Sequence, residues 1–138
     1  LGFFAADLCA CQAQSLADAG LAPADIGHVN AHGTGTLAND RSESRALRAV
    51  FGDHGPPVTS TKAAHGHAIG ATGALEAIAA ILALEQGLLP PTLGYQAADP
   101  DCALDLVLGR ARAAKVGAVM SNAFAFGGLN AVLILSRR

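Results

Sequence analysis

The sequence predicts a layered α/β domain with a mixed sheet. Helical and strand-like patterns alternate from the N-terminus, and strand-like runs alone close the chain. In addition, 51% of the residues are hydrophobic and only 14% are charged, whereas an ordinary soluble domain carries about 25% charged residues. The length of 138 residues suits one domain, residues 1–138, with a real core. The low charge leads us to expect that part of the surface is normally covered.

Three segments carry a helical pattern. The second starts from a cap at Asn39 or Asp40, with Glu43 at capping-box spacing from Asp40. The third is apolar nearly all round and predicts a central, buried helix. The expected helices are Ala5–Ala19, Asp40 to about Phe51, and Ala71–Glu85.

Short apolar runs between and after these helices predict the strands of the sheet. The expected strands are Ile26–Ala31, Val58–Thr61, Leu104–Leu108, Ala118–Ser121 and Asn130–Leu135. The first two each end in a loop of small residues that contains histidine. The sheet therefore positions both histidine loops.

Charge and cysteine content narrow the function classes. A net charge of −2 without clusters of Lys or Arg among aromatics disfavours nucleic-acid binding. Cys9, Cys11 and Cys102 form no disulfide framework, which indicates a reducing, cytoplasmic location. No signal-peptide pattern opens the chain, and the apolar run Ala71–Leu84 is shorter than the roughly 20 residues that span a bilayer, so we expect no membrane span. A start without Met suggests a fragment or processed piece.

Two histidines set against glycine are the strongest functional signal. His32 lies in the segment NAHGTGT and His67 in the segment KAAHGH. Glycine lets a ligand approach the backbone closely, and the hydroxyls of Thr34 and Thr36 add hydrogen-bond donors. A lone histidine after a strand more often has a structural role, but the neighbouring glycines and threonine hydroxyls favour a ligand-binding or catalytic site. Without a nearby acidic partner, the two histidines suggest donors to an oxyanion rather than a Ser-His-Asp relay.

Other polar residues have simpler interpretations. His65 and His67 could form a His-x-His metal site, but zinc needs three or four ligands, so we expect no metal. His28 and His54 look like surface or loop positions without a role. Glu76 interrupts an apolar helix, where a carboxylate is costly unless it is paired.

Lys62 is the natural partner of Glu76, so we expect a structural ion pair that also orients the histidine loop. The loop Phe124–Asn130 supports two interpretations equally. It is either a tight turn between strands with core phenylalanines, or a mobile gate in which the backbone N–H of Phe126 serves an oxyanion hole.

Four stretches occur together in one order: VNAHGTGTLAND, STKAAHGHAIGATGALEAI, LLPPTLGY and SNAFAFGGLNAVLILSR. In this order and spacing they resemble the C-terminal part of the β-ketoacyl-acyl-carrier-protein synthases, condensing enzymes of the thiolase superfamily. ADPDCALDL and SNAFA look most like the nodulation-protein-E branch and its elongating relatives. The resemblance implies the C-terminal half of a thiolase-like fold, with α/β/α layers and a mixed sheet.

The resemblance also implies roles for individual residues. His32 and His67 would be the two histidines of a Cys-His-His site, which hold the malonyl thioester and stabilise the enolate formed as carbon dioxide leaves. Thr34 and Thr36 would bind the phosphopantetheine arm of acyl carrier protein, the expected partner, and no other cofactor is implied. The supporting residues would be Lys62, Glu76, the gating Phe126 and Asn130. The full-length parent is expected to be a homodimer.

The chain departs from the family pattern at four places. Leu129 stands where the family usually has Thr, Ala125 where it often has Gly, and His65 where a hydroxyl residue is commoner. None of the three cysteines lies in the strand-to-helix turn of the family's nucleophile. We therefore expect a fragment that is inactive alone.

Two alternatives remain. A thiolase would need a second cysteine between Ser121 and Asn130, and there is none. A non-catalytic subunit of the chain-length-factor kind, or a scaffold subunit, is disfavoured because both histidines are present.

Overall fold

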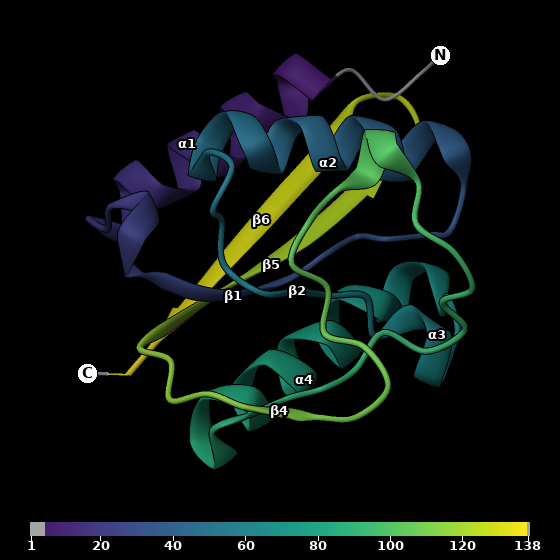
Figure 1. Ribbon diagram of the computed structural model, residues 1–138. Coiled ribbons are helices and arrows are strands. Elements are labelled where there is room, and N and C mark those ends of the chain that lie inside the picture. Colours follow the sequence, from purple (N-terminus) through teal and green to yellow (C-terminus); the bar gives the residue numbers. More distant parts are fainter. Residues whose placement is uncertain (1–4, 138) are drawn as a thin grey trace.

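A four-stranded mixed sheet forms the centre of the molecule, for which a computed structural model describes residues 5–137 (Figure 1). Within these residues the strand order is β2-β1-β5-β6. β1 pairs in parallel with β2 and β5, and β5 pairs antiparallel with β6. The strands are β1 (Ile26–Asn30), β2 (Val58–Thr59), β5 (Ala118–Ala125) and β6 (Leu129–Ser136). The predicted α/β class and mixed sheet are confirmed.

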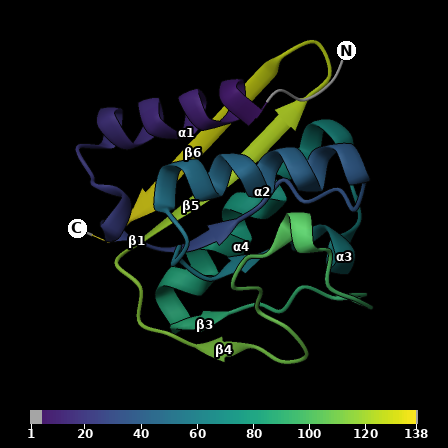
Figure 2. The same ribbon diagram turned by 45° about the horizontal axis from the view of Figure 1, so that its top comes forward.

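Helices cover both faces of this sheet. α1 and α2 pack together on one face, and α4 packs on the other against β5 and β6 (Figure 2). The short helix α3 follows β2 and lies beside α4 (Figure 1). The bounds are α1 (Ala5–Ala19), α2 (Leu37–Phe51), α3 (Lys62–His65) and α4 (Thr72–Gln86), with single 3-10 turns at Pro23–Asp25, Ile69–Ala71 and Pro100–Cys102.

The second helix begins earlier than predicted. Thr36 is its N-cap, and the Thr36 hydroxyl accepts a hydrogen bond from the Asn39 backbone N–H at 3.4 Å. Asp40 instead lies inside the first turn and accepts from the Gly35 N–H. Glu43 takes no part in a capping box, because its side chain is buried under the helix.

Two strand predictions change in detail. Leu104–Leu108 is not a regular strand, yet it extends the sheet beyond β2: Val58 N–H donates to Asp105 O at 2.8 Å and Val107 N–H donates to Val58 O at 3.0 Å. The second predicted strand ends at Thr59, since Thr61 begins the turn of α3. A separate antiparallel pair, β3 (Leu88–Leu89) and β4 (Arg112–Ala113), was not predicted from the sequence. Pairs this short carry too little periodicity to be recognised.

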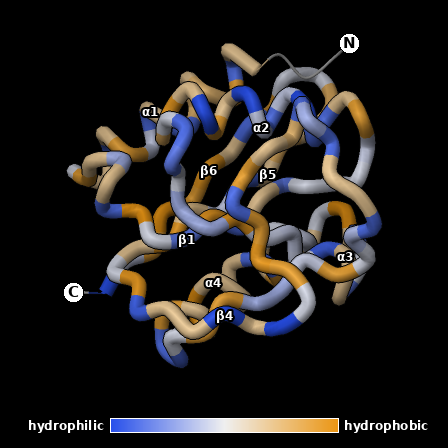
Figure 3. The backbone as a smooth tube through the Cα atoms, viewed as in Figure 1, coloured by the Kyte–Doolittle hydropathy of each residue, from blue (hydrophilic) through white to orange (hydrophobic). Residues whose placement is uncertain are grey.

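The helix α4 is not buried all round, as its apolar sequence had predicted. One face packs on the sheet through small residues and Glu76. The opposite face leaves a stripe of aliphatic side chains between 37% and 56% exposed: Leu75, Ile78, Ile81 and Leu82. The reason is geometric, because the described chain offers this helix a single layer to pack against. In Figure 3, the backbone of α4 lies below the sheet and is coloured mainly in the hydrophobic range.

By length and composition, the continuous helical run Ile69–Gln86 would be long enough to cross a membrane. Its sheet-facing side, however, packs against β5 and contains the buried carboxylate of Glu76. In this structure the run therefore forms one outer layer of an α/β domain, with its inner side packed on the sheet.

His28 lies in the core rather than on the surface. Its side chain is 1% exposed, and Nε2 lies 3.1 Å from the Thr59 hydroxyl. That hydroxyl donates its single proton to Pro90 O at 2.8 Å, so Nε2 must be the donor to Thr59. Burial lowers the pKa of His28 to about 4, which keeps the ring neutral.

Acidification is expected to destabilise the fold through His28. In the unfolded chain the ring binds a proton near its ordinary pKa of 6.5, whereas the folded ring resists protonation down to about 4. The stability contribution is therefore complete above pH 6.5 and is lost as the pH falls from there towards 4. Chemical denaturation between pH 7.5 and 5 measures this loss.

The variant His28→Gln keeps a donor near Thr59 but cannot titrate, so its stability should depend less on pH. The exposed His54 provides a matched control, because His54→Gln should retain the full pH dependence. Equal pH dependence in His28→Gln and the parent would contradict the prediction.

Candidate active site

The two histidine loops meet because the strands before them are parallel neighbours. β1 ends at Asn30 and leads to His32, and β2 ends at Thr59 and leads through α3 to His67. Loops that follow adjacent parallel strands emerge at the same edge of a sheet. The imidazole centroids of His32 and His67 lie 5.8 Å apart, and the ring planes are nearly perpendicular at 87°. The structure thus brings together the two principal residues singled out from the sequence.

His32 is the buried member of this pair. Its side chain is 5% exposed, and its ring lies edge-on to Phe124 with a centroid distance of 5.7 Å. Burial, with smaller electrostatic contributions from the nearby Lys62 and His67, lowers the pKa of His32 to about 4. A neutral imidazole can donate one hydrogen bond at neutral pH without giving up its proton.

His67 is exposed and lies on the loop between α3 and α4. Its Nδ1 lies 3.1 Å from the hydroxyl of Thr72, the buried first residue of α4. When that hydroxyl donates to Nδ1, the proton of a neutral ring must lie on Nε2. In that tautomer the contact anchors one edge of the ring and leaves Nε2 at the other edge as a donor.

The predicted partnership of Lys62 and Glu76 is confirmed. The Lys62 ammonium donates directly to Glu76 Oε1, and the two side chains are 5% and 0% exposed. Burial raises the pKa of Glu76, and the hydrogen bond and charge of Lys62 pull it back down. This ion pair joins the turn that precedes His67 to the middle of α4.

A second buried carboxylate, which was not predicted from the sequence, is Glu43 on α2. Its Oε1 accepts from the His32 backbone N–H at 2.8 Å and from Asn122 Nδ2 at 3.0 Å. Its Oε2 accepts from the Gly33 N–H at 2.8 Å and from Asn39 Nδ2 at 3.4 Å. Burial raises the pKa of Glu43, but these donors, led by Gly33 N–H, favour the carboxylate. A single side chain therefore holds the backbone of the His32 loop.

The sequence did contain a signal for Glu43. Asn39, Glu43, Ala46 and Leu47 recur at helical spacing, and all four are buried. Glu43 thus lies on the apolar stripe of its helix rather than on the charged face. A carboxylate in that position needs buried donors.

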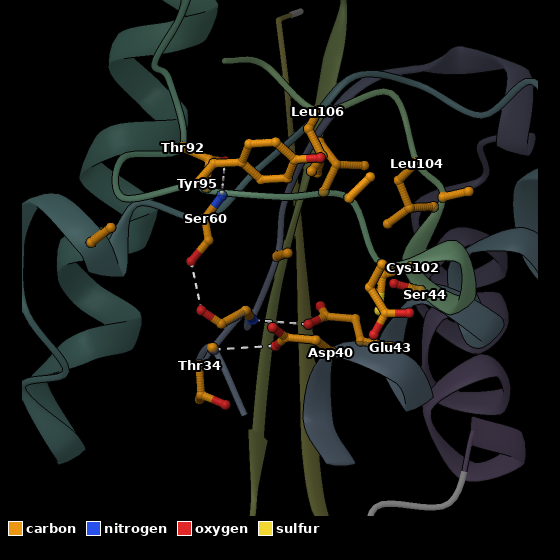
Figure 4. Close-up of a pocket in the computed structure, with 18 of the residues that line it drawn as sticks. Thr34, Asp40, Glu43, Ser44, Ser60, Thr92, Tyr95, Cys102, Leu104 and Leu106 are labelled. Carbon is orange, nitrogen blue, oxygen red and sulfur yellow. Dashed lines mark hydrogen bonds between the residues drawn. The ribbon is translucent and has the colours of Figure 1, made fainter. Parts of the chain in front are cut away.

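A cavity of about 900 Å³ opens beside the His32 loop (Figure 4). It lies between α2 and the segment 92–106, and its lining includes Thr34, Ser60, Lys62 and His67. Figure 4 shows Ser60 beneath Thr92 and Tyr95, with Glu43, Ser44 and Cys102 along the opposite wall. The volume lies in the range of cavities that hold drug-sized ligands, about 300–1,000 Å³.

Gly33 is required at the wall of this cavity. Its φ is +42°, and an added Cβ would lie 2.6 Å from Ser60 Cβ. The Ser60 hydroxyl also donates to Gly33 O at 2.7 Å. Only glycine allows the two loops to approach this closely.

The two threonines take different positions. Thr34 lines the cavity, whereas Thr36 caps α2 and is not among the lining residues. Their hydroxyls lie 3.1 Å apart, so one can donate to the other.

The third loop forms the turn between β5 and β6. Phe126 lies in this turn and is 83% exposed, and Gly127 and Gly128 have φ values of +87° and +83°. Asn130 pairs with Phe124 across the hairpin. The ring of Phe124, on β5, packs on His32. The gating role of Phe126 therefore remains a prediction.

This combination of layers and paired histidine loops matches a known family. The sequence model of the family "Beta-ketoacyl synthase, C-terminal domain" matches residues 5–96, and the chain belongs to that family. Nodulation protein E of Rhizobium meliloti is 53% identical over 120 residues, which cover 86% of this chain and 30% of that protein. 3-Oxoacyl-[acyl-carrier-protein] synthase 2 of Coxiella burnetii is 47% identical over 129 residues, covering 92% of this chain and 31% of that protein.

Solved structures agree with the fold. The ishigamide ketosynthase/chain length factor superimposes with a TM-score of 0.95 and 44% identity, covering 98% of this chain and 34% of that one. AntDE:AntF, a type II polyketide acyl-carrier protein in complex with its ketosynthase, superimposes with a TM-score of 0.90 and 30% identity. The match covers 98% of this chain and 34% of that one. The expected thiolase-like fold is confirmed. The chain spans about a third of the length of these relatives, less than the expected half.

Replacing Glu43 by Gln is expected to destabilise the chain by about 1–3 kcal/mol, because an amide NH2 would face buried N–H donors. Chemical denaturation measures the loss, and amide hydrogen exchange should become faster at His32 and Gly33. Glu85→Gln, at an exposed position of α4, should change neither quantity. Unchanged exchange at His32 in Glu43→Gln would show that the carboxylate does not hold this loop.

Removing one partner of the buried ion pair is expected to cost about 3–5 kcal/mol, because the other charge remains buried and unpaired. Lys62→Met and Glu76→Leu test each side separately in denaturation experiments. The double variant should lose less than the sum of the two single losses. Additive losses would mean that the two side chains act independently.

Proposed function

We propose that this chain supplies the histidine-bearing part of a β-ketoacyl-acyl-carrier-protein synthase that catalyses decarboxylative Claisen condensation. The observation that carries the proposal is the convergence of His32 and His67, with centroids 5.8 Å apart, beside a cavity. Loss of carbon dioxide from a malonyl thioester leaves negative charge on the thioester oxygen. Two neutral N–H donors aimed at that oxygen lower the barrier electrostatically.

The difference between the two histidines suits this task. Buried His32 stays neutral because its pKa is about 4, so it donates without being consumed as an acid. His67 is held at Nδ1 by Thr72, which leaves Nε2 to point at a substrate. Lys62 and Glu76 would act behind them by fixing the turn that carries His67.

The cavity would receive the phosphopantetheine arm of an acyl carrier protein. Thr34 on its wall could hydrogen-bond the arm, with Thr36 behind it through the hydroxyl contact at 3.1 Å. Phe126 and Asn130, on the β5–β6 hairpin, would act as gate and support. The acyl-carrier-protein complex among the structural relatives supports a carrier protein as partner. We further propose that the full-length protein is a homodimer.

The cysteine nucleophile would come from the part of the relatives' length that this chain does not match. The free thiols Cys11 and Cys102 have pKa values raised by burial, which disfavours the reactive thiolate. The 138-residue chain alone is therefore proposed to be inactive.

A second candidate function is a non-catalytic partner subunit. Relatives solved as pairs of ketosynthase and chain length factor favour it. In that case the histidines would be dispensable for product formation by the partner.

The test uses a protein that contains this chain together with the part that carries the cysteine nucleophile, called the longer protein below. It is incubated with acyl- and malonyl-loaded acyl carrier protein, and mass spectrometry detects the ketoacyl product. His32→Ala and His67→Ala should each lower the rate by about 10²–10³, the usual effect of removing one oxyanion donor. His54→Ala, at an exposed position, should leave the rate unchanged. Undiminished product from both histidine variants would refute the proposed chemistry. Ketoacyl product from the 138-residue chain alone would refute its inactivity.

A further inference from the structure

His65 uses both ring nitrogens although its side chain is exposed. Nδ1 lies 2.8 Å from Gly66 O, and Nε2 lies 3.1 Å from the Thr61 hydroxyl. The ring thus bridges the two ends of the short turn that carries Lys62 and leads to His67. The sequence suggests His65 as half of a His-x-His metal site, which is disfavoured, and as a departure from a hydroxyl residue, and neither interpretation gives it a structural role.

The atoms around His65 determine where its protons lie. Gly66 O can only accept, so Nδ1 must carry a proton. The Thr61 hydroxyl has one proton, and two groups compete for it: Nε2 of a neutral His65, and Asn30 Oδ1 at 3.3 Å. When Nε2 is also protonated, it donates to Thr61, and Thr61 is free to donate to Asn30. Protonation of His65 therefore satisfies every group in the chain of contacts.

This chain of contacts reaches both histidine loops. Asn30 ends β1, shortly before His32, and its Nδ2 donates to Glu76 O at 3.5 Å. Thr61 and Asn30 are buried, so their hydrogen bonds do not compete with bulk water. The contacts run from the α3 turn through the end of β1 to the backbone of α4.

We propose that His65 is a positioning residue whose second ring proton reverses the Thr61 hydroxyl and tightens the turn that holds Lys62 and His67. The charged and titratable groups around it are Lys62 and His67 on the same segment and Glu76 from α4. The effect on catalysis rests on the proposed function, whereas the hydrogen-bond switch does not.

The first experiment measures the ring of His65 in the 15N-labelled 138-residue chain by long-range 1H–15N NMR between pH 5 and 8. The neutral ring should carry its proton on Nδ1, and protonation should move the Thr61 and Asn30 side-chain resonances together. A neutral ring protonated on Nε2, or unmoved Thr61 and Asn30 signals, would overturn the proposal. This result is independent of any enzyme activity.

Matched variants separate the two halves of the bridge. His65→Asn can keep the contact with Gly66 O, and His65→Gln can keep the contact with Thr61. Because neither side chain titrates, neither variant should show the pH-dependent shift of the Asn30 side-chain resonances. Amide exchange at Gly66 should be about fivefold faster in His65→Ala, which corresponds to one lost hydrogen bond of about 1 kcal/mol, and unchanged exchange there would contradict the bridge.

In the longer protein, the pH profile of kcat should change in His65→Gln while KM stays the same. An unchanged profile would remove the catalytic part of the proposal. If the unsubstituted protein forms no product while the NMR result stands, the proposed function fails and the switch remains.

Discussion

The arrangement of the site depends on Glu43. A buried carboxylate needs several donors, and the folded chain supplies four from three different elements: the His32 loop, α2 and β5. Without this anchor, the backbone N–H groups of His32 and Gly33 would face the interior without an acceptor. The loop could then relax away from Ser60 and from the partner histidine. The position of His32 is thus set by its backbone, and its ring is left available for other contacts.

The two histidines differ in how rigidly they are held. His32 is fixed by Glu43, packed on Phe124 and shielded from water. His67 is exposed and depends on the turn of α3, on Thr72 and, through Lys62, on Glu76. The pair therefore combines one ring held in a preset position with one that can adjust.

Much of the fold and part of the site could be predicted from the sequence. The first helix and the strands around the histidine loops carry clear periodicity, and Glu76 stood out because a carboxylate in an apolar helix calls for a partner. Glu43 did not stand out, because its neighbours Arg41 and Arg45 made α2 look like an ordinary charged helix. His28 was misplaced because a histidine in a short strand gives no sign of burial until its partner, Thr59 on another strand, is known. Contacts between distant strands are not visible in local patterns.

The aliphatic stripe on α4 has a further consequence. The same helix carries Glu76 on its inner face and Leu75 and Ile78 on its outer face, so displacement of the helix changes both environments together. Burying the stripe against another surface would contribute roughly 25 cal/mol for each Å² removed from water. That free energy is coupled mechanically to the Lys62 turn, because the ion pair ties the turn to the helix. A surface that buried this stripe would therefore bear on the same helix that holds the Lys62 turn before His67.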